Sequence, residues 1–281
     1  MTFNRTPAGM SAQRFFYRVD IIVYCEGSNN DPRSATFDEL FWKKILSNYG
    51  ITCEPKSIGS KNELRKMLLY IVENKITHNI IASDRDYDNY NCNVHFCKKY
   101  IRTLGYSWES DTISLMSFNN VASLFLNSLH YEKLQIQFDE YVEMNKRVLQ
   151  LITAIDINYI FSTSSLFDRN KPLSIILQSE THAPSINISK ILKAAATIID
   201  TKSTTINLKA AREIDGMREF FGKTIAHLVH LWFKHQSLST PKRRNVNYET
   251  FISAAISSIT INRGCLEDLY YTDAIAKLEY Q

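Results

Sequence analysis

The sequence predicts an α/β fold in which a mostly parallel sheet flanked by helices is followed by a mainly helical C-terminal half. Over the first hundred residues, apolar and β-branched runs alternate with segments of helical periodicity. The apolar runs are short and nearly unbroken, as in strands that are buried on both faces. After residue 119 the alternation stops and helical periodicity continues. Alternating strands and helices indicate right-handed crossovers between parallel strands.

The first predicted strand covers residues 19–25, with the sequence VDIIVYC. It ends at Glu26 and Gly27, which precede the polar, turn-forming sequence SNNDPRS. A helix is expected over residues 35–49, because apolar side chains recur there at helical spacing, and a second strand over residues 51–58. The order strand, helix, strand is the first half of the expected sheet.

Ser60 is expected to begin the next helix, because Glu63 three residues later completes a capping-box pattern. A short buried strand over residues 79–82 then runs into the polar sequence SDRDYDNYN. Residues 93–104 are interpreted as a helix, and the sequence SWESDTISLM that follows is interpreted as a loop and a strand. Ligands of parallel sheets gather beyond the carboxyl ends of the strands, so the polar segments that follow them are candidate sites.

The expected division is a catalytic core over residues 1–118 and a mainly helical region over residues 119–281 that completes the fold and mediates assembly. The second region carries apolar stripes at helical spacing, which are typical of core packing. These stripes either contact another protein or close the chain's own core. One stripe contains Val121, Leu124, Phe125 and Leu129, and the other contains Met217, Phe220, Phe221, Ile225, Leu228 and Trp232.

Composition sets the broad class of the protein. Hydrophobic residues make up 44% and charged residues 22% of the chain, which are ordinary values for a globular protein. The net charge of +4 is too small to indicate nucleic-acid binding by itself. Five cysteines without a CxxC pair favour a reducing compartment, and no zinc site is predicted around Cys92, His95 and Cys97. Because no run is long and apolar enough for a signal peptide or a membrane span, we expect a cytoplasmic protein without membrane contact.

Carboxylates follow two of the predicted strands. Glu26 ends the first strand, and Asp84 and Asp86 follow the strand over residues 79–82. An extended backbone from Asp84 onward would place Asp84, Asp86 and Asp88 on one side of the chain. Several carboxylates held together repel one another unless a cation neutralises them. The sequence therefore predicts a divalent metal site at this edge of the sheet.

The donor atoms at this site indicate which metal it would hold. Carboxylate oxygens without nearby cysteine or histidine favour Mg²⁺, with Mn²⁺ as a second possibility, over Zn²⁺. Lys61, at the start of a helix, is a candidate phosphate contact, because backbone N–H groups and the helix dipole favour an anion there. The alternative is that the acidic run is a solvated turn, Glu26 an ordinary loop residue and Lys61 a surface lysine.

These motifs resemble the Toprim fold of topoisomerases, bacterial primases and overcoming-lysogenization-defect nucleases, in which one strand ends in glutamate and a later strand in DxD. The matching sequences here are VYCEG, with Glu26, and SDRD, with Asp84 and Asp86. The chain is most similar to the DUF4435 branch of that family. The further matches to this branch are Gly59 with Lys61, the run from Asp84 to Asp88, the segment from Trp108 to Asp111, and Gly222 with Lys223.

The resemblance implies an activity and partners. It implies a Mg²⁺-dependent ribonuclease that cleaves host tRNA as an anti-phage effector. Its partner would be an ATPase subunit that restrains it until a phage anti-restriction protein is sensed, and the released chain would self-associate as a homodimer. Glu26, Asp84 and Asp86 would hold the metal, with Asp88, Glu109 or Asp111 as further ligands. No tyrosine among the 15 stands out as a nucleophile, so hydrolysis by water is favoured over strand passage.

Two other classes of function remain open. A nucleotide-sugar transferase also uses a DxD motif to hold a metal and a diphosphate, but it does not require the strand-end Glu26. A non-enzymatic assembly subunit would keep the acidic cluster only as a vestige and would not bind Mg²⁺ in the millimolar range. Lys242, Arg243 and Arg244 are a candidate RNA-backbone contact, for which the alternative is a solvated basic loop.

Overall fold

The computed structural model describes residues 6–27, 35–90, 97–126, 131–159, 166–199, 213–238 and 246–279. The chain forms two compact units, which are described separately. The sheet unit comprises Met1–Arg85, Asn93–Leu104 and Ile259–Gln281, and the helical unit comprises Asp86–Cys92 and Gly105–Ser258. No helix within the described ranges is long and apolar enough to cross a lipid bilayer.

The elements of the sheet unit are α1 (Pro7–Ser11), α2 (Gln13–Tyr17), β1 (Ile21–Cys25), α3 (Phe37–Asn48), β2 (Cys53–Ser57), α4 (Lys61–Glu73), β3 (Asn79–Ser83), β4 (Tyr100–Arg102) and α13 (Leu266–Ala276). Those of the helical unit are the 3-10 turn η1 (Asp88–Tyr90), α5 (Trp108–Leu115), α6 (Phe118–Phe125), α7 (Tyr131–Tyr159), η2 (Pro172–Ile175), β5 (Ile176–Leu177), β6 (Ser185–Ile186), α8 (Ile188–Ile199), α10 (Gly216–Glu219), α11 (Gly222–Leu238) and α12 (Tyr248–Ser257).

The sheet unit is built on four parallel strands in the order β2-β1-β3-β4. β1 and β3 lie at the centre, where Tyr24 is the Cα partner of Ile81. All five residues of each of these strands are buried, because helices cover both faces of the sheet. This sheet and the helical segments that follow confirm the predicted α/β class.

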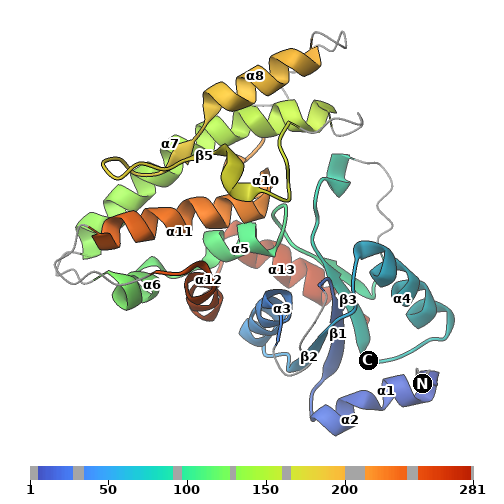
Figure 1. Cartoon of the computed structure of the whole chain (residues 1–281). Helices are drawn as coiled ribbons and strands as arrows, with labels where there is room; N and C mark the ends of the chain where they lie inside the picture. The colour runs from blue at the N-terminus through green and yellow to red at the C-terminus, as the bar shows by residue number, and fades with distance from the viewer. Residues whose placement is uncertain are drawn as a thin grey trace. The chain divides into compact units, whose positions relative to one another are not determined.

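Helices α3 and α4 lie on opposite sides of the sheet (Figure 1). The chain moves from β1 to β2 in one direction and then returns past β1 to β3, so right-handed crossovers place the two helices on opposite faces. On the α4 face, Ile22, Tyr24 and Ile81 of the strands pack with Leu64 and Ile71 of the helix. This reversal of strand order makes the carboxyl ends of β1 and β3 a topological switch point.

The C-terminal helix α13 also belongs to the sheet unit. Tyr271 is fully buried, and the Tyr270 hydroxyl donates to the carbonyl oxygens of Arg102 and Thr103 at 3.1 and 3.3 Å. The compact units therefore do not follow the division predicted at residue 119, since the chain returns to the sheet unit at Ile259.

The helical unit is organised around aromatic side chains of α7 and α11. Phe138 lies 5.0 Å from Trp232 and 5.9 Å from Phe233, measured between ring centroids. Phe220, Ile225, Leu228 and Trp232 of the second predicted stripe are at most 1% exposed, which confirms their core role. In the first stripe Val121 and Phe125 are buried but Leu124 is 53% exposed, and Leu129 lies outside the described residues.

Two segments have a different secondary structure from the one expected. Tyr100–Arg102 is strand β4 and not part of the helix expected over residues 93–104, of which residues 93–96 lie outside the described residues. Its pairing with β3 is a long-range contact that outweighs local helical periodicity. Trp108–Leu115, expected to be loop and strand, is helix α5. Glu109 and Asp111 lie in its first turn, where the helix dipole favours negative charge.

The predicted capping box at Ser60 is also wrong. Ser60 is the N-cap of α4, but its side chain makes no capping hydrogen bond, and Glu63 pairs with Lys66 at 2.7 Å instead. A complete capping box begins α3, where Thr36 Oγ1 accepts from the Glu39 amide at 3.2 Å and Glu39 Oε2 accepts from the Thr36 amide at 2.9 Å.

Replacing Thr36 by alanine should destabilise the sheet unit by about 1–2 kcal/mol. The change removes the cap of α3 and the 2.8 Å hydrogen bond between the Thr36 and Ser57 hydroxyls. Urea unfolding measures the loss. Ser60→Ala is the matched control, since Ser60 holds the same position in α4 without a capping bond, and equal losses in the two variants would contradict this assignment.

Candidate functional site

Two of the predicted carboxylates lie at the switch point of the sheet. Glu26 follows Cys25, the last residue of β1, and Asp84 follows Ser83, the last residue of β3. The two strands are adjacent and parallel, and both side chains are partly exposed. This edge is where open α/β sheets bind their ligands. The sheet unit thus brings Glu26 and Asp84 to the same edge, as the sequence predicts.

Lys61 lies at this edge as well. Reciprocal backbone hydrogen bonds of 3.0 and 2.8 Å join Gly27 to Gly59 and hold the loop before α4 beside the end of β1. Both glycines have positive φ angles, of 113° and 116°, which side-chain-bearing residues rarely adopt. Lys61, the first residue of α4, directs its Nζ to the carbonyl oxygen of Arg85 at 3.5 Å. A cation from a helix N-terminus therefore reaches the segment that carries Asp84.

The acidic run after β3 does not continue as an extended strand. Asp86 has a left-handed backbone with φ of 53°, and η1 begins at Asp88. The expectation that an extended backbone aligns Asp84, Asp86 and Asp88 is therefore wrong. The three aspartates are nevertheless partly exposed, whereas the intervening Arg85 and Tyr87 are buried at 6% and 2% exposure. A turn, rather than a pleat, directs the aspartates away from the core.

Glu109 and Asp111 are buried in the first turn of α5, at 2% and 1% exposure. Asp111 Oδ1 accepts the Gly105 amide at 2.6 Å, which is a structural contact between α5 and the segment that precedes it. Glu109 Oε2 accepts the Ser107 hydroxyl at 2.5 Å. A Cβ at Gly222 would lie 2.0 Å from the Ser107 Oγ, so a glycine at the start of α11 is required by close packing on α5.

Other charged side chains lie close enough to Glu109 to shift the pKa of its carboxyl. Burial raises the pKa of the Glu109 carboxyl, while the Ser107 hydrogen bond and the charge of Lys223 act in the opposite direction. The charge of Asp86 raises this pKa further. Asp86, Glu109 and Lys223 therefore form one electrostatic neighbourhood within the helical unit.

The six predicted metal ligands are divided between the two units. Glu26 and Asp84 belong to the sheet unit, and the other four belong to the helical unit. In the part of the chain that the structure describes, no group of three or more histidine, cysteine, aspartate or glutamate side chains is arranged to hold one metal ion. The donors at the switch point are carboxylate oxygens, a set that fits Mg²⁺ or Mn²⁺. The metal site stays a prediction.

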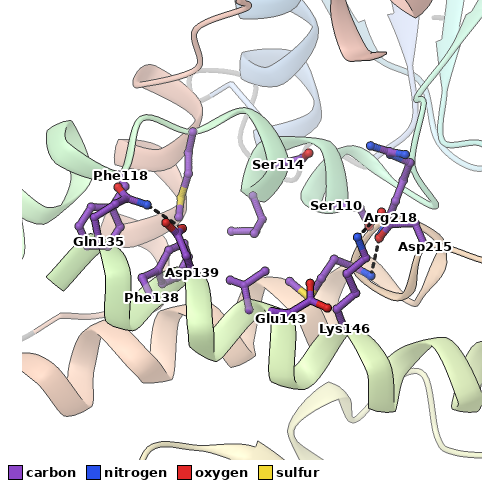
Figure 2. Close-up of a pocket in the computed structure, with 14 residues that line it drawn as sticks. Ser110, Ser114, Phe118, Gln135, Phe138, Asp139, Glu143, Lys146, Asp215 and Arg218 are labelled. Carbon is purple, nitrogen blue, oxygen red and sulfur yellow. Dashed lines mark hydrogen bonds and ion pairs between the residues drawn. The ribbon is translucent and has the colours of Figure 1, made fainter. Parts of the chain in front are cut away.

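A cavity of about 480 Å³ lies in the helical unit between α5, α7 and α10 (Figure 2). Its lining includes Ser110 but neither Glu109 nor Asp111. Polar groups in the lining bind one another, as in the 3.1 Å ion pair of Lys146 with Asp215. The predicted metal ligands therefore do not line this cavity.

Some candidates fall outside the described residues. These are Cys92, His95 and the basic segment Lys242, Arg243 and Arg244. Cys97 is a free thiol, so no disulfide involves it.

Asp156 and Arg169 are two residues that lie beside the acidic turn and that the sequence motifs do not identify. The Tyr87 hydroxyl donates to Asp156 Oδ2 at 3.0 Å, and Arg169 Nη2 donates to the same oxygen at 2.9 Å. Asp156 is 1% exposed in α7. The available signal was an acid within the apolar sequence LITAID, which indicates a buried charge with a partner but does not identify that partner.

No protein-family model, curated protein or solved structure matches the chain.

Histidine titration predicts the acid sensitivity of the helical unit. Burial, the neighbouring His230 and Lys223 lower the pKa of His227 to about 4, and its ring stacks on Tyr248 at 4.0 Å. The unfolded chain binds this proton near pH 6.5, so the folded state loses stability as the pH falls from about 6.5 towards 4. His227→Phe, which keeps an aromatic ring, should show a smaller fall in melting temperature over that range.

Thermal unfolding at several pH values tests this expectation. The control is His182→Gln, because His182 is exposed and its replacement should leave the parental profile unchanged. A His227→Phe profile as steep as that of the parent would contradict the role given to His227.

Proposed function

We propose that the chain is a metal-dependent nuclease of the Toprim type that hydrolyses phosphodiester bonds. The observation that carries this proposal is that Glu26 and Asp84 follow the carboxyl ends of two adjacent, parallel central strands. The position of Lys61 supports it, because a lysine at a helix N-terminus, beside the segment of Asp84, attracts an anionic phosphate to the carboxylates. A sugar-nucleotide transferase would not require Glu26 at this point.

The proposed roles follow from the chemistry of the side chains. In the sheet unit, Glu26 and Asp84 would hold the cation. By the resemblance of the sequence motifs, Asp86 would be a further ligand, with Asp88 or Glu109 as further acidic groups. When bound, Mg²⁺ or Mn²⁺ would supply Lewis-acid polarisation of the phosphoryl oxygen and an activated water. Lys61 would orient the phosphate by contacting a non-bridging oxygen. Tyr87 is unsuited to nucleophilic attack, because burial raises the pKa of its hydroxyl, which is also bonded to Asp156.

Within this class, the sequence motifs resemble those of AriB, the Toprim effector subunit of the PARIS anti-phage defence system. On that resemblance we propose a cytoplasmic endoribonuclease with host tRNA as substrate. The ATPase subunit AriA would restrain it, a phage anti-restriction protein would be the indirect trigger, and a homodimer would form on release. This narrower proposal is supported by the strand-end motifs together with the further sequence matches at Gly59 and Lys61, at Trp108 to Asp111, and at Gly222 and Lys223.

Incubation of the purified protein with total tRNA, plasmid or single-stranded DNA, in Mg²⁺ or in EDTA, tests the proposal. We expect shortened tRNA in Mg²⁺ and intact tRNA in EDTA. Cleavage of DNA alone would keep the nuclease assignment and overturn the choice of RNA. The absence of metal-dependent cleavage of all three substrates, at any protein concentration tested, would contradict the nuclease proposal.

A further inference from the structure

A buried polar network lies directly behind the acidic turn of the helical unit. The Tyr87 hydroxyl and Arg169 Nη2 both donate to Asp156 Oδ2, at 3.0 and 2.9 Å. The Arg169 guanidinium carbon also lies 5.5 Å from the centroid of the Tyr87 ring. Asp156 and Tyr87 are at most 2% exposed, so the carboxylate depends on these donors in place of water.

Backbone hydrogen bonds and a ring contact also hold the same turn. The Asp86 amide donates to the carbonyl oxygen of Tyr106 at 2.7 Å, and the Tyr106 amide donates to the carbonyl oxygen of Arg218 at 2.7 Å. The Tyr87 and Tyr106 rings meet edge to face at 4.8 Å. These contacts fix the backbone around Asp86, whose positive φ is uncommon for a residue with a side chain.

Tyr87 connects this network to two of the candidate metal ligands. Tyr87 lies between Asp86 and Asp88, and its buried side chain leaves the two flanking carboxylates partly exposed. Because the backbone of Tyr87 joins Asp86 to Asp88, an anchor on the Tyr87 side chain restricts movement of the segment that carries both carboxylates. Carboxylate ligands bind a cation well only when surrounding groups fix their orientation.

We propose that Tyr87, Asp156 and Arg169 form a positioning network, here called the turn tether, that orients Asp86 and Asp88 for a divalent cation. The inference rests on the proposed nuclease function for its catalytic consequence. It also gives α7, the helix of Asp156, a role in the site beyond the assembly role expected of the helical half. Tyr87, Asp156 and Arg169 act through the aspartates and do not touch the substrate.

Tyr87→Phe tests the turn tether most sharply. The change removes one hydroxyl and keeps the ring packed against Tyr106, while Asp156 retains its bond to Arg169. The expected result is that the Mg²⁺ concentration for half-maximal cleavage rises by about tenfold, whereas the rate at saturating Mg²⁺ changes little. Hydrogen exchange at the amides of Asp86 and Tyr90 should become faster, because the turn loses an anchor.

Tyr141→Phe is the matched control. Tyr141 is also a buried tyrosine of the helical unit, and its hydroxyl donates to the carbonyl oxygen of Leu228 at 3.3 Å. The control should lower the melting temperature to a similar extent without changing the Mg²⁺ dependence or the exchange of the turn. A merely structural role for Tyr87 would give the same pattern as the control.

The two proposals fail in different ways. Parental Mg²⁺ dependence and parental exchange rates in Tyr87→Phe would overturn the turn tether while leaving the nuclease function in place. If the parental protein cleaves no nucleic acid, the nuclease function fails, and the exchange measurement alone decides whether Tyr87 anchors the turn.

Discussion

Glu26→Ala and Asp84→Ala should each reduce metal-dependent cleavage by more than about 100-fold while leaving the fold nearly intact. Each change removes one of the two carboxylates at the ends of β1 and β3. The loss of one acid also relieves repulsion between like charges, so the melting temperature without metal should be equal to or above the parental value. Initial cleavage rates at fixed Mg²⁺ and thermal unfolding in EDTA measure the two effects.

Glu73→Ala is the control for this prediction, because Glu73 is an exposed acid at the other end of α4 in the same unit. It should cleave at the parental rate. A Glu26 or Asp84 variant that matches it in activity would show that the switch point is not the site of catalysis.

Gly216→Ala should destabilise the helical unit by about 3 kcal/mol or more. A Cβ at Gly216 would lie 2.2 Å from the carbonyl oxygen of Lys146 and 2.4 Å from the amide nitrogen of Gln150. Both atoms belong to the backbone of α7, so α10 must move away as a whole to make room. Urea unfolding followed by circular dichroism at the helical signal measures the loss.

A second glycine substitution separates steric conflict from backbone strain. Gly50 has a positive φ of 74°, but a methyl group added to its Cα would meet no atom within 4 Å, so Gly50→Ala should cost only about 1–2 kcal/mol. A loss in Gly216→Ala no larger than this would contradict the close packing of α10 on α7.

The central part of the fold could be predicted because its signals are local. β1 and β3 are short apolar runs, each followed at once by polar residues, so both strands and the acids Glu26 and Asp84 at their ends were located correctly. Since parallel strands align their carboxyl ends, the sequence also predicted that these two acids share an edge.

The errors occur where distant contacts decide the structure. Tyr100–Arg102 is a strand because β3 offers it an edge, and no local pattern contains that information. Asp86 adopts a left-handed turn whose amide bonds to Tyr106, twenty residues further along the chain. The partners of Tyr87 are more distant still, so a spacing argument on the run from Asp84 to Asp88 could not detect them.

Calorimetric titration of Mg²⁺ into the metal-free protein tests the central claim most directly. The proposal predicts saturable binding in the millimolar range or tighter, and loss of this binding in Glu26→Gln, which keeps the shape of the side chain and removes its charge. Titration gives this answer whether or not the true nucleic-acid substrate is known. A parental protein that does not bind Mg²⁺, or a Glu26→Gln variant that binds it unchanged, would contradict the assignment of the switch point as a metal site.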